Sequence, residues 1–286
     1  MITIRRLCDC TLQDVILAWN EGFEGYFVKM NFSLEQFLKR LVHEELSAKH
    51  SILLYDGDTP VGIVLNGMRE IDGKKLAWNG GTGIAPAYRN QGLGRLAIAE
   101  CIRIYEEEGV ESATLEAIEE NHPAIRLYEK MGYKTIGRLM NYSCSKSIGL
   151  PARSAAYRTE LRPPAELVRL PFFHENRPWQ TQRRSIQNGE AIVLIDEEGK
   201  ECAYAIYQKG WQEAGDLQAI YLYQAELCSS PKPEMAEALL QAVFGASPVS
   251  SYVINLSLKE DGWDSTLKEM GFKETVGQVW MEYKFN

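Results

Sequence analysis

The spacing of apolar positions changes repeatedly along the chain, and each change marks a predicted secondary-structure element. Short alternating runs favour strands, whereas apolar residues three or four positions apart favour amphipathic helices. In the first half the predicted elements are, in order, a strand at 2–7, two helices within 11–45, a hairpin of 52–55 and 61–66, a strand at 76–84, a helix at 91–108, a strand at 112–120, a short helix after Asn121 and a strand at 133–140. Strands and helices in this order predict an α/β (α+β) fold built on a mixed sheet.

The second half repeats the same order of elements. Its predicted elements are a hairpin of 190–196 and 202–208, a strand at 216–223 and an amphipathic helix at 233–244. The run Glu129-Lys-Met-Gly-Tyr-Lys134 is echoed, at an offset of 139 residues, by Lys268-Glu-Met-Gly-Phe-Lys273. An internal repeat of this kind indicates two copies of one fold.

Domain boundaries follow from the stretch between the two copies. Residues 147–156 show no apolar periodicity, which is typical of a linker. We therefore predict a first domain at 1–146, a linker at 147–163 and a second domain at 164–286. A chain of 286 residues with 45% apolar content can supply two separate cores.

Composition and charge exclude several classes of protein. The net charge is −8 and both halves are acidic, which argues against a nucleic-acid-binding surface. No apolar run approaches the ~20 residues that span a bilayer, and no secretory signal follows Met1, so we expect a cytoplasmic protein without membrane contact. The six cysteines lack the spacing of a zinc site, and we expect reduced thiols. The acidic balance is compatible with amine substrates and equally with a role in solubility.

The most informative motif lies between the strand at 76–84 and the helix that follows it. It reads Arg89-x-x-Gly92-x-Gly94-Arg95. Glycines without a Cβ let a ligand approach the backbone, and the first N–H groups of the helix, with the positive end of its dipole, attract an anion. The arrangement could hold a pyrophosphate, although its spacing matches neither the dinucleotide-binding fingerprint nor the phosphate-binding loop of nucleotide triphosphatases.

A second group of residues follows about thirty positions later. Asn121 is a good helix N-cap, Pro123 suits an early helical position, and Tyr128 lies about two turns further on the same side. A family resemblance rests on Ile84-Ala-Pro-x-Tyr-Arg89-x-x-Gly92-x-Gly94, Glu116, Asn121, Tyr128 and Met131-Gly-Tyr133. In these residues and their order, the chain resembles the GNAT acetyltransferase superfamily over about residues 50–140.

The resemblance implies an acetyl-CoA-dependent N-acetyltransferase that needs no metal and transfers acetyl directly in a ternary complex. Each domain would be a mostly antiparallel sheet with a splayed strand pair, flanked by helices. The residues implied to bind acetyl-CoA are Thr82, Gly83, Ile84, Arg89, Asn90, Gln91, Gly92, Leu93, Gly94, Arg95, Asn121 and Tyr128.

Two residues are candidates for proton transfer. Tyr128 would protonate the departing thiolate, and Glu116 would accept the proton of the amine, directly or through water. The structural alternatives stay open: Tyr128 as a core residue, Glu116 as an exposed strand residue, and Asn121 as a plain N-cap. Aromatic residues at 23, 26, 27 and 78 either line the acceptor pocket or belong to the core.

The same offset of 139 residues makes the second copy look degenerate. It aligns Arg89–Gly94 with Cys228–Pro233, Asn121 with Glu260 and Tyr128 with Leu267, so the glycines, the cap and the phenol are all missing. We expect one site for acetyl-CoA, in the first half, and a small-molecule amine as acceptor. A protein N-terminus or lysine as acceptor, and an acetyl-CoA-binding module without catalysis, remain alternatives. The identity of the amine and the oligomeric state stay open.

Overall fold

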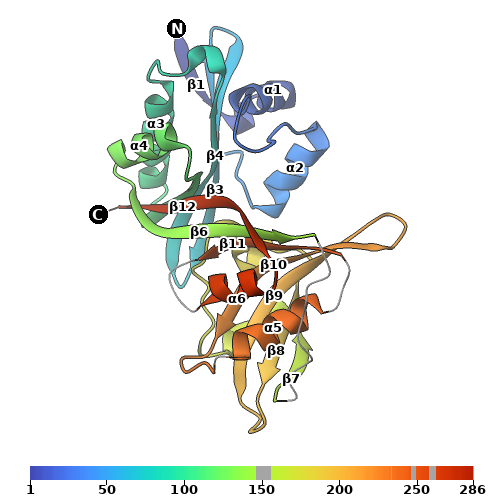
Figure 1. Ribbon diagram of the computed structural model, residues 1–286. Coiled ribbons are helices and arrows are strands. Elements are labelled where there is room, and N and C mark those ends of the chain that lie inside the picture. The colour runs from blue at the N-terminus through green and yellow to red at the C-terminus, as the bar shows by residue number, and fades with distance from the viewer. Residues whose placement is uncertain (146–155, 233, 246–248, 258–261, 286) are drawn as a thin grey trace. The chain divides into compact units, whose positions relative to one another are not determined.

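The computed structural model describes residues 1–145, 156–232, 234–245, 249–257 and 262–285. The chain divides into two compact units, of which the first comprises Met1–Ile136 with Val279–Asn286 and the second Gly137–Gln278 (Figure 1). Both units are mixed α/β structures, as predicted. No helix among the described residues is long and apolar enough to cross a membrane.

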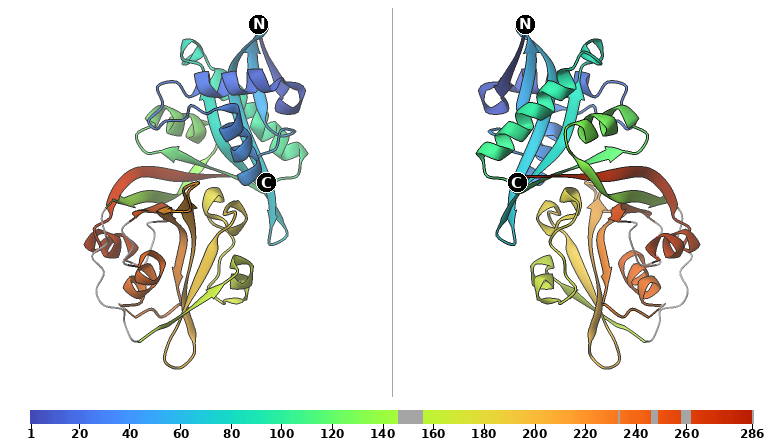
Figure 2. Two further views of the ribbon diagram at one scale, coloured as in Figure 1. Left: turned by 90° about the vertical axis from the view of Figure 1, so that its right-hand side faces the viewer. Right: turned by 90° about the vertical axis from the view of Figure 1, so that its left-hand side faces the viewer.

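Unit 1 is a sheet with helices on both faces. Its strands follow the order β1-β2-β3-β4-β5-β12. Their bounds are β1 Ile2–Arg6, β2 Ile52–Asp56, β3 Thr59–Ile71, β4 Lys74–Ile84, β5 Ser112–Ile118 and, from Val279 onward, β12 Lys273–Lys284. Helices α1 (Leu12–Gly22) and α2 (Leu34–His43) cover one face, and α3 (Leu93–Glu107) and α4 (His122–Lys130) cover the other (Figure 2). The pairs β1/β2, β2/β3 and β3/β4 are antiparallel, and β4 and β5 are parallel.

The helices of unit 1 begin at residues that the sequence marks as caps. Thr11 caps α1, Ser33 forms a capping box with Gln36 on α2, and Asn121 accepts from the Ala124 N–H on α4. The predicted helix at 91–108 corresponds to α3. Local capping chemistry therefore accounts for where these helices start.

The last strand of the chain belongs to the core of unit 1. Met281 is 0% exposed there and lies in the same apolar cluster as α3 and α4. The Ser112 hydroxyl donates to Glu282 over 2.6 Å, and the Phe285 N–H donates to the Glu111 carbonyl over 3.0 Å. A compact unit that draws on Val279–Asn286 differs from the predicted division at 146 and 164, because periodicity identifies a strand without identifying its partner.

Unit 2 repeats the element order of unit 1. Its strands follow the order β6-β11-β10-β9-β8-β7, with β10 and β11 parallel, as β4 and β5 are. The bounds are β6 Lys134–Cys144, β7 Arg158–Arg162, β8 Glu190–Ile195, β9 Glu201–Trp211, β10 Leu217–Leu227, β11 Ser250–Ser257, α5 Glu234–Phe244 and α6 Trp263–Glu269. Alternate residues of β8 and β9 pack into two separate clusters, so this sheet is covered on both faces.

One segment of the predicted linker has regular structure. Residues 158–162 form β7, which pairs antiparallel with β8. The earlier part of that linker, 146–155, lies outside the described residues. The pattern of 158–162 was too short and too polar to indicate a strand, and its pairing with β8 supplies what its sequence lacks.

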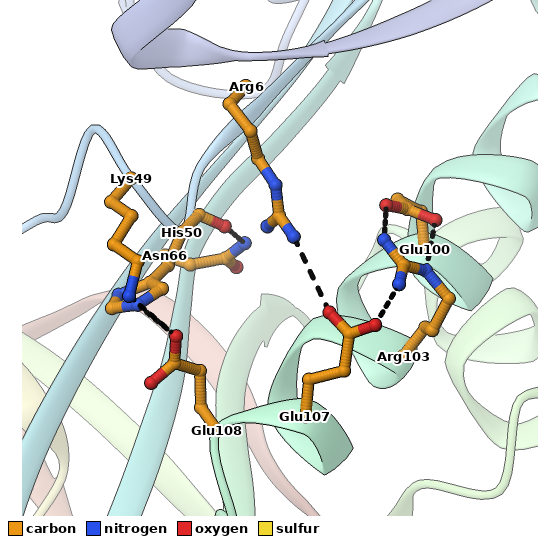
Figure 3. A network of polar contacts seen from close by, with 8 residues as sticks. All are labelled: Arg6, Lys49, His50, Asn66, Glu100, Arg103, Glu107 and Glu108. Atoms are coloured by element: carbon orange, nitrogen blue, oxygen red, sulfur yellow. Dashed lines mark hydrogen bonds and ion pairs between the residues drawn. The ribbon is translucent and has the colours of Figure 1, made fainter.

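A network of charges surrounds the end of α3 (Figure 3). The Glu108 carboxylate lies 2.9 Å from Lys49 Nζ, 3.1 Å from Lys75 Nζ and 3.1 Å from His50 Nε2. Hydrogen bonds from Lys49, Lys75 and His50, in that order, lower the pKa of Glu108 to about 2. Lys75 also donates to the Glu108 carbonyl over 2.6 Å, which places a cation at the negative end of the helix dipole.

We expect this network to make unit 1 sensitive to acid. Because the pKa of Glu108 is lowered from 4.5, its stabilisation is complete above pH 4.5 and is lost as the pH falls through about 2. Solvent screening reduces the effect, and Glu108→Gln should lower the free energy of unfolding by about 1–2 kcal/mol at neutral pH. Urea unfolding between pH 7 and pH 2 should show the two proteins converging. Glu107→Gln, which removes a more exposed carboxylate paired with Arg103, is the control and should change stability by less than about 0.5 kcal/mol.

Candidate active site

The site is built where β4 and β5 separate. Their parallel pairing runs from Leu76↔Ser112 to Asn79↔Leu115, and beyond it β4 continues to Ile84 paired with β3 alone. Gly80 is an extra residue in β4, because Leu65 pairs with Gly81 and Asn66 with Asn79. This bulge bends β4 where it diverges from β5, as the splayed pair in the predicted fold requires, and we term this divergence the slot.

The alternation of the strand decides which backbone groups face the slot. The Ala85 N–H donates to the Val61 carbonyl of β3 over 2.9 Å. Backbone groups point alternately to the two sides of a strand, so those of Thr82 and Ile84 point toward the side from which β5 has diverged. Consistent with this, the Ile84 carbonyl accepts from Arg89 Nε over 2.9 Å. Gly83 allows α1 to pack on the strand, because a Cβ there would lie 3.0 Å from the Phe23 ring.

The N-terminus of α3 has the properties of an anion site. Its N-cap is Gly92 at φ 85°, which supplies no side-chain cap, and the first turn carries no acidic residue. A Cβ on Gly92 would meet no protein atom within 4 Å, so the space above this turn is open. Gly94 serves packing instead, because its Cβ would lie 3.0 Å from Leu127 of α4. The side chains of Asn90 and Arg95 are exposed beside this turn.

Arg89 makes contacts that the sequence did not indicate. Its guanidinium donates to the Ile84 carbonyl, to the Gly22 carbonyl over 3.2 Å and to the Glu24 carbonyl over 2.8 Å. These bonds tie the turn before α3 to the end of α1. Gln91 likewise donates to the Ala87 carbonyl over 2.7 Å. A direct contact of Arg89 with phosphate stays a prediction, since in this structure the side chain positions the turn.

Tyr128 lies on α4 with its phenol toward Thr82 of β4. Tyr128 is 7% exposed. Burial raises the pKa of Tyr128 to about 12, and a hydrogen bond with the Thr82 side chain opposes that rise. Two residues predicted to act at different steps, Thr82 and Tyr128, are therefore brought together across the slot.

Tyr26 joins this group from the segment after α1. A hydrogen bond links the phenol of Tyr26 to the Asn121 side chain, and burial, as the larger effect, raises the pKa of Tyr26. The Tyr26 ring packs edge-on against Phe23 and Phe27, with centroids 5.2 and 5.5 Å apart. The sequence left Tyr26 as either pocket lining or core, and its proximity to Asn121 could not be read from spacing.

Glu116 lies on β5 at the point where the slot begins. Trp78 Nε1 of β4 donates to Glu116 Oε2 over 2.7 Å. Trp78 is buried, while Glu116 is only partly buried. This bond holds the carboxylate beside the last paired residues of β4 and β5.

The corresponding region of unit 2 is built differently. Its helix α5 carries Glu234 and Glu237 in its first turn, which would repel a phosphate. The position aligned with Tyr128 is Leu267, which is fully buried in the core. Pro233 and Glu260, which align with Gly94 and Asn121, lie outside the described residues.

In unit 2, a segment of the protein itself packs where β10 and β11 diverge. Their pairing ends at Leu222↔Val253. A short helical turn, η4 (Trp179–Thr181), packs against both strands there: Gln224 donates to the Thr181 carbonyl over 2.6 Å, and Asn255 donates to the Gln180 side chain over 3.3 Å. The segment 179–181 therefore lies where β10 and β11 diverge, a place that the protein leaves to no such helical turn in unit 1 among the described residues.

Comparison with known proteins agrees with this architecture. A GCN5-related N-acetyltransferase from Sphaerobacter thermophilus has a TM-score of 0.67 and 14% identity over 99% of this chain and 95% of the other. A tandem GNAT protein from the clavulanic acid biosynthesis pathway has a TM-score of 0.65 and 11% identity over 99% and 98%. A putative acetyltransferase from Pyrococcus horikoshii has a TM-score of 0.63 and 15% identity over 100% and 90%. No curated protein matches the sequence.

At these identities the structural likeness shows the fold, and the sequence match supplies the family. The family described as "Acetyltransferase (GNAT) family" matches residues 14–133, a range that contains α1 to α4, the slot and Tyr128. By this sequence match, residues 14–133 are a GNAT acetyltransferase domain.

Proposed function

We propose that unit 1 transfers acetyl from acetyl-CoA to the primary amine of a small molecule, by direct attack in a ternary complex. The observation that carries the proposal is the slot between β4 and β5, with an uncapped helix N-terminus at one end and the buried phenol of Tyr128 within hydrogen-bonding reach of Thr82. Each part answers a separate requirement of acetyl transfer.

The residues present fit acetyl-CoA. The open space above Gly92 and the absence of acidic residues in the first turn of α3 suit a pyrophosphate. The backbone groups of Thr82 and Ile84 would pair with the amides of the pantetheine arm, as an added strand does. The Asn121 side chain, which now contacts Tyr26, would exchange that contact for the arm. When bound, acetyl-CoA supplies the thioester.

Tyr128 is suited to hold a proton until the thiolate departs. With a pKa raised to about 12, the phenol is protonated at neutral pH. Donation to a thiolate whose thiol has the ordinary pKa of ~8.5 would be uphill, but the same burial that raises the pKa of the phenol also raises the pKa of a buried thiol. The bond from Thr82 orients the phenol across the slot.

Glu116 would accept the proton that the amine loses. An alkyl amine is mostly protonated at neutral pH and must become neutral to attack. The carboxylate lies at the mouth of the slot and is oriented by Trp78. A general base needs only hydrogen-bond reach, directly or through one water, of the proton that it accepts.

The test is a screen of primary amines with the full chain, in which transfer is measured as the release of thiol from acetyl-CoA. Calorimetry should give one acetyl-CoA per chain. Two equivalent sites would contradict the assignment of binding to unit 1 alone. Tight binding without transfer to any amine, to peptide N-termini or to lysine would favour the non-catalytic alternative, and transfer only to peptides would favour the protein-directed one.

A negative charge placed at the start of α3 should weaken the binding of acetyl-CoA strongly. We expect Gly92→Glu to lower the affinity for acetyl-CoA by about 100-fold or more, because it introduces both a side chain and a negative charge where the helix dipole attracts phosphate. Gly92→Asn tolerates the positive φ without adding charge and should weaken binding far less. Gly109→Glu is the matched control, since Gly109 also has a positive φ and open space but lies beyond the other end of α3. Equal affinity of all three variants for acetyl-CoA would show that the phosphate binds elsewhere.

A further inference from the structure

Asn79 is a buried polar residue of β4 that the proposed function does not use. Only 5% of the residue is exposed. Because a buried amide destabilises the fold unless its polar atoms are bonded, its partners indicate its role. Asn79 Oδ1 accepts from the Gly81 N–H over 3.0 Å, and Asn79 Nδ2 donates to Thr82 Oγ1 over 2.9 Å. Both partners lie further along the same strand, so the side chain spans the bulge at Gly80.

The bulge is what brings Asn79 and Thr82 together. Residues three apart in a regular strand point to opposite faces of the sheet, and the extra residue Gly80 places these two on the same face. A Cβ on Gly80 would lie 2.6 Å from the Trp78 ring, so this position requires a glycine. From α2, Arg40 Nη2 donates to the Gly80 carbonyl over 2.5 Å. The bulge is therefore fixed through its own carbonyl and through the N–H that follows it.

Thr82 connects this arrangement to the phenol of Tyr128. The Gly81 N–H requires an acceptor, which identifies Asn79 Oδ1 and leaves the NH2 group of Asn79 facing Thr82. The Thr82 hydroxyl then has one proton to give. Asn79 Oδ1 lies 3.2 Å away but already accepts from Gly81, whereas the hydrogen bond between Thr82 and Tyr128 offers the phenol oxygen as acceptor. A phenol that accepts from Thr82 keeps its own proton available for the thiolate.

We propose that Asn79 is a positioning residue for the proton donor: through Thr82 it sets the direction of a hydrogen-bond chain that ends at the Tyr128 phenol. The proton passes from the phenol to the departing thiolate. The phenolate left behind keeps the bond donated by Thr82, which stabilises it until it takes a proton back from water. The inference rests on the proposed acid role of Tyr128 and adds the group that orients this acid.

The variant Asn79→Asp should reverse the chain at its first bond. A carboxylate keeps the shape of the side chain and still accepts from the Gly81 N–H, but it takes the Thr82 proton instead of donating to Thr82 Oγ1. The hydroxyl then accepts from Tyr128, whose proton turns away from the thiolate. We expect kcat to fall by about 10-fold or more while the affinity for acetyl-CoA stays nearly unchanged. Thr82→Val, which keeps the branched shape and the backbone groups, should give the same loss, and Thr82→Ser should restore most of the rate.

Double variants separate positioning from a structural defect. In the Tyr128→Phe protein there is no phenol to orient, so the addition of Asn79→Asp or Thr82→Val should not lower kcat further. A further loss of the same size would show that Asn79 acts independently of Tyr128 and would overturn the proposal. Asn20→Asp is the matched control, because Asn20 also accepts from a backbone N–H and donates from its amide, both to Phe32. This variant should keep the kcat of the unchanged protein.

A measurement without substrates tests the chain separately from the proposed function. In NMR spectra of protein with tyrosine labelled at Cζ, the Tyr128 signal is identified by its absence in Tyr128→Phe, and its shift reports the hydrogen bonds of the phenol. The signal should move in Asn79→Asp and in Thr82→Val and stay in place in Asn20→Asp. A signal that moves in neither variant overturns the proposal, whatever the rates. If no amine is acetylated, or if Tyr128→Phe is as fast as the unchanged protein, the proposed function or its acid is wrong, and the signal still decides whether Asn79 orients the phenol.

Discussion

Tyr128→Phe should lower kcat by about 100-fold or more while the affinity for acetyl-CoA stays nearly unchanged. The substitution keeps the ring that packs 5.9 Å from Tyr133 and removes only the hydroxyl near Thr82. Since burial raises the pKa of Tyr128 to about 12, the phenol keeps its proton across the working range, and the rate should show no alkaline loss from this group below that pH. Steady-state rates with the amine found by screening, and calorimetry with acetyl-CoA, give the two measurements.

The matched control is Tyr133→Phe. Tyr133 lies in the same apolar cluster, packs against the Tyr128 ring and has a pKa that is likewise raised by burial, but the hydrogen bond with Thr82 is made by Tyr128. Its variant should retain kcat. If the two variants have equal rates, Tyr128 serves packing alone and another group protonates the thiolate.

Removal of Val279–Asn286 should unfold unit 1 and abolish acetyl-CoA binding, although the deleted residues are far from the slot in sequence. The deletion uncovers the edge of β5 and the cluster around Met281, which is fully buried. Met281→Ala alone should lower the free energy of unfolding by about 2–5 kcal/mol. Circular dichroism, urea unfolding and calorimetry with acetyl-CoA measure these effects.

Lys284→Ala is the control on the same strand, because Lys284 is exposed and pairs only loosely with Glu282. It should change stability by less than about 0.5 kcal/mol. A shortened chain that ends near Ser147 should behave like the variant without Val279–Asn286, since it also lacks β12. If that shortened chain folds and binds acetyl-CoA with full affinity, β12 adds nothing that unit 1 requires.

Local signals in the sequence predicted much of unit 1. Thr11, Ser33 and Asn121 cap helices where expected, because capping depends on residues three positions apart. Gly92 begins α3 with a positive φ, as a glycine before a helix can. The echo between 129–134 and 268–273 predicted the repeated order of elements in unit 2, and that order is confirmed.

Such local signals do not predict contacts between parts of the chain that are distant in sequence. Arg89 reads as a phosphate ligand from its motif, but its partners are carbonyls of Gly22, Glu24 and Ile84. The link from Tyr26 to Asn121 joins positions separated by almost a hundred residues. A cavity in unit 2 is lined by Arg177, Glu226 and Asn255, which come from three separate segments.

The sequence by itself determined the order and type of most elements, the repeat of the fold, and the motif that marks the start of α3. These depend on periodicity, capping and glycine conformation, which act over a few residues. Only the tertiary structure decided that β12 enters unit 1, that Arg89 positions a turn, and that η4 fills the second slot. The physical reason is that an unpaired strand edge or a buried carbonyl accepts any partner of suitable shape, and the identity of that partner depends on packing across the whole unit.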